Sequence, residues 1–119
     1  MELKIYHNSR CRKSREALQY ISENHKEVQV IEYLKEPLTC DEWKAVFEKI
    51  GMTPSEIVRT QEALWKSNYK GKNLSEEALL EVLAENPRLI ERPIITTQTS
   101  GVLARPLEAL IHFLKKSGN

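Results

Sequence analysis

Residues 3–15 read LKIYHNSRCRKSR and contain the point at which a strand is followed by a helix. The start of this stretch alternates between apolar and polar side chains, as a half-buried strand does. Beyond Cys11, the residues Ala17, Leu18 and Ile21 fall on one face of a helix. The sequence therefore predicts a strand–loop–helix junction, with Cys11 beside the first backbone N–H groups of the helix.

Cys11 has surroundings that favour the thiolate over the thiol. The free N–H groups and the positive dipole end of a helix stabilise a negative charge. Cations also stand nearby in the sequence, at Arg10, Arg12, Lys13 and Arg15. A lone cysteine is often a buried, unreactive residue, but these polar neighbours favour a reactive one. Because the thiolate is the nucleophile, the stretch predicts cysteine chemistry.

Length and composition limit the class of protein. A chain of 119 residues is long enough for one domain with its own core. Its 18 basic and 17 acidic residues give a net charge of +1, which does not favour nucleic acid or anionic lipid as partners. The sequence has no membrane-spanning run and no signal-peptide pattern. Cys11 and Cys40 are too few for a secreted disulfide framework, so we expect a cytoplasmic protein.

The rest of the chain alternates between strands and helices. Glu27 to Leu34 is rich in valine and isoleucine and is predicted to be a second strand, parallel to the first. Thr39 and Glu42 form a capping box before a helix that ends at Gly51. The further helical segments predicted in the middle of the chain are Pro54–Arg59, Glu62–Ser67 and a helix capped by Ser75 that stops near Asn86-Pro87.

The last third of the chain predicts a hairpin and a helix. Ile94–Thr97 and Val102–Ala104 are strand-like and flank a turn, and a C-terminal helix follows Pro106. This order predicts an α/β thioredoxin-like fold with a mixed four-stranded sheet and an inserted helical subdomain. The expected single domain is 1–119, with a core of 1–37 and 88–119 and an insert of 38–87.

Ser14 stands three positions after Cys11, so the motif is Cys-x-x-Ser. A single thiol forms no internal disulfide, and any oxidised state of Cys11 therefore requires an external thiol. Ser14 is predicted either to hydrogen-bond the thiolate or to be an ordinary first-turn serine. His7 is expected either to influence the thiolate or to serve packing. Cys40 lies beside Asp41 and is interpreted as structural, with a resolving thiol as the alternative.

Three arginines are candidates for binding an anion. Arg59 ends a short segment, whereas Arg92 and Arg105 each precede a proline. The guanidinium fork suits tetrahedral oxyanions, although a solvated surface charge is the simpler explanation for any one arginine. In the thioredoxin fold the proline before the third strand is often cis and faces the active cysteine. Pro93 is therefore the cis-proline candidate, and Arg92 is expected beside Cys11.

Taken together, these residues resemble the ArsC-like arsenate reductases that depend on glutathione and glutaredoxin, a family related to the Spx-like proteins. The resemblance covers essentially the full chain. The motifs that carry it are Ile5-Tyr6-His7-Asn8, Cys11-x-x-Ser14-Arg15, Tyr33-Leu34 with Pro37, Val58-Arg59, Asn86-Pro87, Arg92-Pro93-Ile94 and Leu103-Ala104-Arg105-Pro106.

The resemblance implies that Cys11 attacks arsenate and that glutathione and glutaredoxin then complete its reduction to arsenite. It implies glutathione as a co-substrate. Because the sequence carries no metal, nucleotide or flavin motif, we expect no metal and no tightly bound cofactor. The residues to which the resemblance assigns oxyanion binding are Arg59, Arg92 and Arg105, and those to which it assigns tuning of the thiolate are His7 and Ser14.

The chain departs from the familiar reductases in the loop, where they resemble Cys-Gly-Thr-Ser and this chain has Arg12-Lys13 between Cys11 and Ser14. Arg12 adds bulk and charge close to the predicted oxyanion site.

Two other functions stay open from the sequence. The first is an Spx-like regulator that binds RNA polymerase, because Gly51 and Arg92 occupy positions that such regulators use for this contact. The second is a thiol oxidoreductase with a substrate other than arsenate. A complete set of Arg59, Arg92 and Arg105 favours an enzyme over a polymerase-binding protein.

Overall fold

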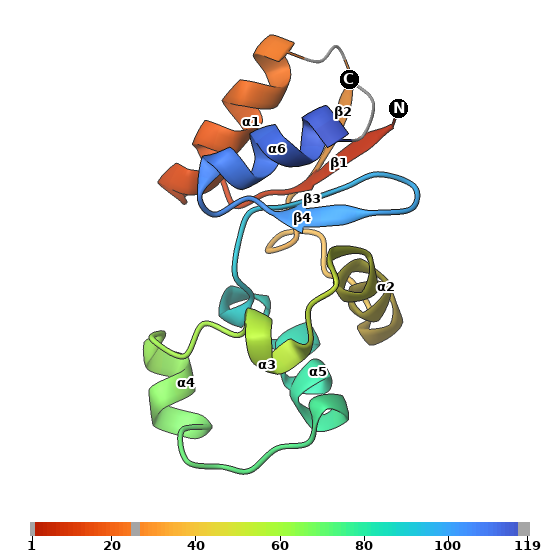
Figure 1. Ribbon diagram of the computed structural model, residues 1–119. Helices are drawn as coiled ribbons and strands as arrows, with labels where there is room; N and C mark the ends of the chain where they lie inside the picture. Colours follow the sequence, from red (N-terminus) through yellow and green to blue (C-terminus); the bar gives the residue numbers. More distant parts are fainter. Residues whose placement is uncertain (1, 25–26, 117–119) are drawn as a thin grey trace.

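A computed structural model of the protein describes residues 2–24 and 27–116 and contains one mixed four-stranded sheet (Figure 1). The ends of the expected domain, residues 1 and 117–119, and residues 25–26 lie outside the described residues. The strands are β1 (Leu3–Tyr6), β2 (Val28–Ile31), β3 (Ile94–Thr96) and β4 (Gly101–Leu103). In the order β2-β1-β3-β4, only β1 and β2 run parallel. The predicted α/β thioredoxin-like fold is confirmed.

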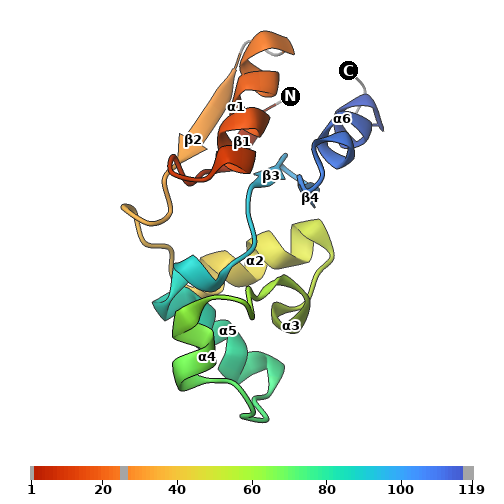
Figure 2. The same ribbon diagram turned by 90° about the vertical axis from the view of Figure 1, so that its left-hand side faces the viewer.

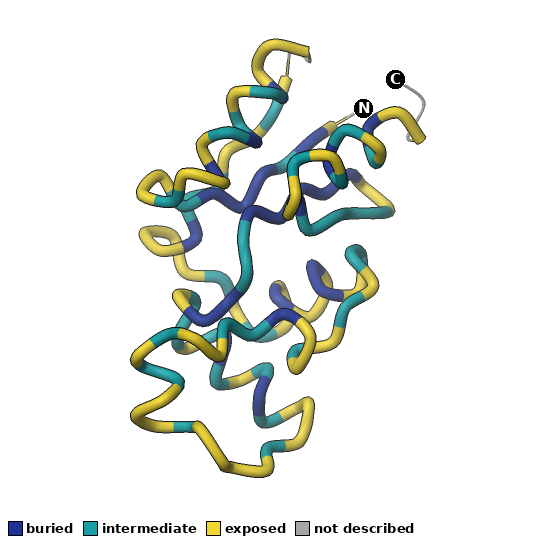
Figure 3. Tube along the Cα trace, turned by 60° about the vertical axis from the view of Figure 1, so that its left-hand side comes forward, coloured by how far each residue is buried: buried dark blue, intermediate teal, exposed yellow. Residues whose placement is uncertain are grey.

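The alternation of side chains along β1 builds two cores, one on each face of the sheet. Leu3 and Ile5 face α1 (Arg12–Asn24) and α6 (Leu107–Lys116), where they join one buried cluster. Tyr6 faces the opposite side and joins a second cluster. This placement follows from the two-residue period of a strand. The buried strand positions lie along β1 and β3, whereas the described residues of β2 and β4 are intermediate or exposed (Figure 3).

The second cluster is formed with the helices between β2 and β3, which lie on the face of the sheet opposite to α1 and α6 (Figures 1 and 2). Those elements are α2 (Cys40–Ile50), α3 (Pro54–Ile57), α4 (Ala63–Asn68), α5 (Glu76–Glu85) and the short 3-10 helix η1 (Pro87–Leu89). None of the helices in the described ranges is long and apolar enough to cross a membrane.

Both ends of α2 are closed as the sequence predicts. The Thr39 hydroxyl accepts a hydrogen bond from the Glu42 N–H at 3.1 Å, and the Glu42 carboxylate accepts one from the Thr39 N–H at 2.9 Å. Gly51 ends the helix with φ of 69°, a left-handed conformation that favours glycine. The helix cap therefore gives a structural reason for glycine at this position.

Trp43 of α2 is the centre of the second cluster and is fully buried. Its ring centroid lies 5.5 Å from that of Tyr33, 5.7 Å from that of Phe47 and 5.8 Å from that of Tyr6. Aromatic pairs at this spacing stabilise the core beyond the contribution of the apolar area that they bury. Trp43 thus packs α2 against Tyr6 of β1 and against Tyr33, which lies two positions beyond the end of β2.

The structure corrects the predicted strand boundaries. The second strand was expected over Glu27–Leu34, but its pairing ends at Ile31. The chain turns at Glu32, whose carbonyl accepts hydrogen bonds from the N–H groups of Lys35 and Glu36, both at 2.9 Å. This turn carries Tyr33 into the second cluster instead of along the sheet. The last strand likewise begins one residue earlier than expected, at Gly101.

Removing the capping hydroxyl of α2 tests the local stability of this helix. Thr39→Ala is expected to lower the free energy of unfolding by about 1 kcal/mol, because the Glu42 N–H loses its acceptor. Chemical denaturation monitored by circular dichroism measures this change. Thr60→Ala, at an exposed threonine, is the matched control and should leave the midpoint unchanged. Equal midpoints for the two variants would contradict the assignment.

Candidate active site

Three segments meet at one edge of the sheet and form the candidate site (Figure 2). Because β1 and β2 are parallel, both chains leave the sheet at this edge, and Tyr6 pairs there with Ile31. Because β3 runs antiparallel to β1, it enters the sheet at the same edge, where Ile94 pairs with Tyr6. The loop after β1 holds Cys11, the turn after β2 holds Tyr33, and Arg92 lies two residues before β3.

Cys11 lies just before α1, and its N–H donates to the Asn8 carbonyl at 2.9 Å. Partial burial opposes ionisation of the thiol. Hydrogen bonds from the Ser14 backbone and the Arg92 side chain outweigh the effect of burial, and the Lys13 backbone donates a weaker hydrogen bond. Together with the positive charge of Arg92, these contacts lower the pKa of Cys11 below its usual value. The thiolate is therefore favoured by its position before a helix and by Arg92, which is distant in the sequence but close in the fold.

The cations next to Cys11 in the sequence act differently from what we expected. The Arg12 guanidinium pairs with Glu16 at 3.1 Å, and the side chain of Arg15 donates to the Ser9 carbonyl at 3.0 Å. The Arg92 side chain lowers the pKa of Cys11 through a hydrogen bond and through its charge. Two of the four cations expected around Cys11, Arg12 and Arg15, are thus engaged with other partners.

His7 and Ser14 form a buried pair beneath the Cys11 loop. The His7 Nδ1 and the Ser14 hydroxyl oxygen are 2.7 Å apart, and the same oxygen accepts a hydrogen bond from the Asn8 N–H at 3.0 Å. Burial lowers the pKa of the His7 imidazole, and Arg15 contributes in the same direction against the charge of Glu32. The Ser14 hydroxyl thus links His7 to the Asn8 backbone and braces the loop, while the Ser14 backbone N–H faces Cys11.

Arg59 reaches the site from the helical segment between β2 and β3. Its guanidinium donates to Glu91 at 3.0 Å and to Glu62 at 3.3 Å, and its side chain is 18% exposed. The Arg59 backbone N–H donates to the Leu89 carbonyl, which fixes the segment beside the strand entry. Two carboxylates therefore already share this arginine, and an anion that binds Arg59 competes with them.

Arg105 and Arg92 both precede cis prolines, Pro106 and Pro93. The side chain of Arg105 donates to the Arg92 carbonyl at 3.4 Å, and Arg105 itself is exposed. The structure thus brings Arg92 against Cys11 and sets Arg105 outside Arg92.

A pocket of about 440 Å³ opens beside the Cys11 loop. It is lined by the loop after β1, by the turn after β2 and by Arg92, together with Arg88 and Glu62. Its positive side chains outnumber its carboxylates, which favours an anionic ligand. The full lining is His7, Asn8, Ser9, Arg10, Glu32, Leu34, Lys35, Glu62, Arg88 and Arg92.

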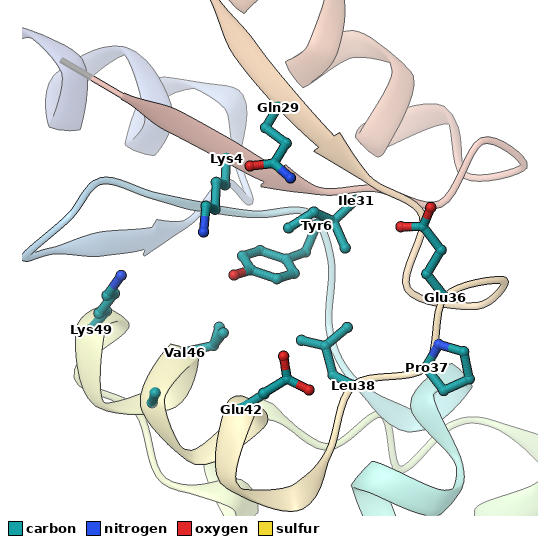
Figure 4. A pocket seen from close by; sticks show the side chains of 11 residues that line it. Lys4, Tyr6, Gln29, Ile31, Glu36, Pro37, Leu38, Glu42, Val46 and Lys49 are labelled. Carbon is teal, nitrogen blue, oxygen red and sulfur yellow. The ribbon is translucent and has the colours of Figure 1, made fainter.

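A second pocket, of about 410 Å³, lies between the sheet and α2 (Figure 4). Lys4 and Lys49 stand at one end and Glu36 at the other, with the Tyr6 hydroxyl pointing into the space between them. Its lining, within the described part of the chain, includes none of the predicted site residues. This pocket is therefore separate from the Cys11 site.

Several buried donors at the candidate site lack acceptors. The Nε of Arg59 and the Nε of Arg92 are buried and have no hydrogen-bond partner among the described residues. The Tyr33 hydroxyl is also buried without a hydrogen-bond partner among the described residues. Burying an unpaired donor is unfavourable, so such a cluster is typical of a site that receives an acceptor-rich ligand such as an oxyanion.

The sequence did not indicate Glu62, Glu91, Lys35 or Arg88 as part of this site. Each is an ordinary charged residue in its local sequence, and only the tertiary fold brings it to the pocket or to Arg59.

Cys40, the first residue of α2, is partly buried and forms no disulfide with Cys11.

The comparison with known proteins agrees with this geometry. The sequence model of the ArsC family matches residues 6–113. YfgD of Escherichia coli K12, an uncharacterized protein, is 37% identical over 115 residues, which cover 95% of this chain and 97% of YfgD. An arsenate reductase of Neisseria meningitidis serogroup A is 38% identical over 109 residues, covering 90% of this chain and 93% of the relative.

Among solved structures, an arsenate reductase from Vibrio cholerae is similar in fold and sequence. The TM-score is 0.86 at 35% identity, and the match covers 94% of this chain and 97% of that one.

The rate at which Cys11 reacts with iodoacetamide tests the thiolate directly. Resolved from Cys40 by peptide mass spectrometry, this rate should titrate with an apparent pKa below that of an unperturbed cysteine. Arg92→Gln is expected to raise the pKa, because it removes both a positive charge and a hydrogen bond. Arg12→Gln is the matched control, since Arg12 is adjacent in sequence but pairs with Glu16. A larger rise for Arg12→Gln than for Arg92→Gln would contradict the geometry.

Proposed function

This chain belongs to the ArsC family of arsenate reductases, and we propose that it reduces arsenate to arsenite through an adduct on Cys11. The observation that carries the proposal is the contact of Arg92 with Cys11, which lowers the pKa of the thiol at a site rich in buried donors. A thiolate next to an arginine is suited to attack an oxyanion while the arginine balances the charge on its oxygens.

In the first proposed step, the Cys11 sulfur attacks the arsenic of dihydrogen arsenate. A sulfur–arsenic bond forms, one arsenic–oxygen bond breaks, and the departing hydroxyl leaves as water after taking the proton of the other arsenate hydroxyl. Arsenic remains As(V) in this step. Hydrogen bonds from the backbone N–H groups of Ser14 and Lys13 lower the pKa of Cys11, which favours the thiolate before the attack.

In the second proposed step, an external thiol attacks the Cys11 sulfur. The sulfur–arsenic bond breaks with both electrons moving to arsenic, which leaves as arsenite in the As(III) state, and a mixed disulfide forms on Cys11. Glutathione is the proposed co-substrate, because Ser14 replaces the second thiol of a Cys-x-x-Cys motif. Glutaredoxin then accepts the glutathionyl group by thiol–disulfide exchange and regenerates the Cys11 thiol.

The arginines have unequal positions in this proposal. Arg92 contacts the nucleophile and is proposed to hold the arsenate as sulfur attacks. Arg59 shares Glu62 and Glu91 and is proposed to exchange part of these contacts for an arsenate oxygen. Arg105 lies outside Arg92 and is proposed to join the anion from solvent.

The proposal requires no metal and no tightly bound cofactor, since the electrons come from thiols. It places the protein in a reducing cytoplasm, where glutathione is available.

Arsenate-dependent oxidation of NADPH, coupled through glutathione, glutaredoxin and glutathione reductase, measures the proposed activity. Turnover is expected for the native chain and should be lost in Cys11→Ser, because the serine hydroxyl is not ionised at neutral pH. Cys40→Ser is the matched control and should retain turnover. Absence of turnover in a folded protein whose Cys11 is reactive would sink the arsenate proposal and favour another thiol substrate or RNA polymerase binding.

Glu91→Gln tests the competition for Arg59. Removing this carboxylate charge frees part of the guanidinium and reduces repulsion of the anion, so KM for arsenate should fall severalfold. Steady-state kinetics in the same coupled assay measure the change. Glu85→Gln, at an exposed glutamate of α5, is the control and should leave KM unaltered. A rise in KM for Glu91→Gln would mean that Glu91 orients Arg59 instead of competing with the substrate.

A further inference from the structure

The Tyr33 hydroxyl is the most conspicuous unused group at the candidate site. Tyr33 is 2% exposed, and its hydroxyl has no hydrogen-bond partner among the residues that the structure describes. A buried hydroxyl without a partner loses the hydrogen bonds that it would make with water, which destabilises the folded state. Phenylalanine would fill the same space without this loss, so the hydroxyl needs an explanation outside packing.

The position of Tyr33 follows from the topology of the sheet. It lies two residues beyond the end of β2, at the edge where the Cys11 loop leaves β1 and where Arg92 enters β3. Its two chain neighbours, Glu32 and Leu34, both line the pocket of about 440 Å³. Tyr33 therefore lies within the turn whose neighbouring residues line this pocket, while Tyr33 itself and Cys11 lie behind the lining.

The electrostatic neighbours of the hydroxyl agree with this position. Burial raises the pKa of Tyr33 to about 12, and the charges that act on it belong to Arg92, Cys11, Arg59 and Glu91. The hydroxyl therefore stays protonated at neutral pH and is a permanent neutral donor. An arginine there would add charge, whereas this hydroxyl adds a hydrogen bond alone.

The ring of Tyr33 is fixed in place by the second cluster. It meets Trp43 edge to face, with ring centroids 5.5 Å apart and planes at 85°. A donor on a fixed ring loses little conformational freedom when a ligand binds, so the group is preorganised.

We propose that the Tyr33 hydroxyl is a further, uncharged donor of the oxyanion site and hydrogen-bonds an oxygen of the tetrahedral anion held between Cys11 and Arg92. This inference rests on the proposed function, and it assigns a substrate-binding role to a residue outside the set of one cysteine and three arginines. The bond satisfies the unpaired hydroxyl only when the anion is bound, so it favours the loaded site over the empty one.

Protection of Cys11 from iodoacetamide by arsenate tests the assignment without requiring turnover. The alkylation rate at Cys11, followed by peptide mass spectrometry at rising arsenate concentration, gives the concentration that halves the rate. Tyr33→Phe is expected to raise this concentration about tenfold, the loss of one hydrogen bond to a charged group. The thiol pKa, measured without arsenate, should stay at the native value.

Tyr6→Phe is the matched control. Tyr6 is also a buried tyrosine and also packs on Trp43, but its hydroxyl points into the separate pocket beside α2 (Figure 4). It should leave the protection by arsenate unchanged. Equal protection of the native chain and Tyr33→Phe would overturn the inference, and so would an equal loss in Tyr6→Phe.

Two further outcomes separate this inference from the proposed function. If Tyr33→Phe raises the thiol pKa and leaves the arsenate concentration unchanged, the hydroxyl serves the Cys11 sulfur and the inference is wrong, while the proposed function stands. If arsenate fails to protect Cys11 of the native chain, the proposed substrate is wrong and the inference falls with it.

Thermal unfolding supplies a readout that a structural role would not give. Because the hydroxyl is unpaired in the free protein, Tyr33→Phe should melt at the native temperature or above it. A lower melting temperature would show that the hydroxyl stabilises the empty fold, which contradicts the inference.

Discussion

The parallel pairing of β1 with β2, next to an antiparallel β3, is the constraint on which the rest of the structure depends. It makes two strand ends and one strand beginning coincide at a single edge of the sheet. Cys11, Tyr33 and Arg92 come from distant parts of the chain and meet there for this reason alone. The two cores on either face keep the edge in place, and the helices between β2 and β3 bring in Arg59.

The sequence predicted those structural elements that are determined by residues close together in the chain. The capping box of Thr39 and Glu42 and the order of strands and helices needed no tertiary contact to be recognised. The extent of β2 was overestimated, because apolar Tyr33 and Leu34 continue the strand pattern while the chain already turns at Glu32. The contribution of Arg92 at Cys11 was expected from the place of Pro93 in the fold, because Arg92 lies 81 positions away in the sequence (92 minus 11).

Charge at the site is balanced instead of uniformly positive. Arg59 is shared by Glu62 and Glu91, whereas Arg92 is directed to the thiol. A chain of net charge +1 thus concentrates donors at one place without a strong overall field. In this arrangement the proposed substrate meets one arginine at the thiol, one arginine that exchanges partners, one exposed arginine and, by our inference, one neutral hydroxyl. Such a mixture selects for geometry as well as for charge.

The central claim is that Cys11 itself carries arsenic and then the reducing thiol. Intact-protein and peptide mass spectrometry after incubation with arsenate and glutathione, without glutaredoxin or NADPH, tests it most directly. The account predicts one glutathionyl group on Cys11, formed only when arsenate is present, because the second thiol attacks sulfur bonded to arsenic. An unmodified Cys11, or equal modification with and without arsenate, would contradict the account.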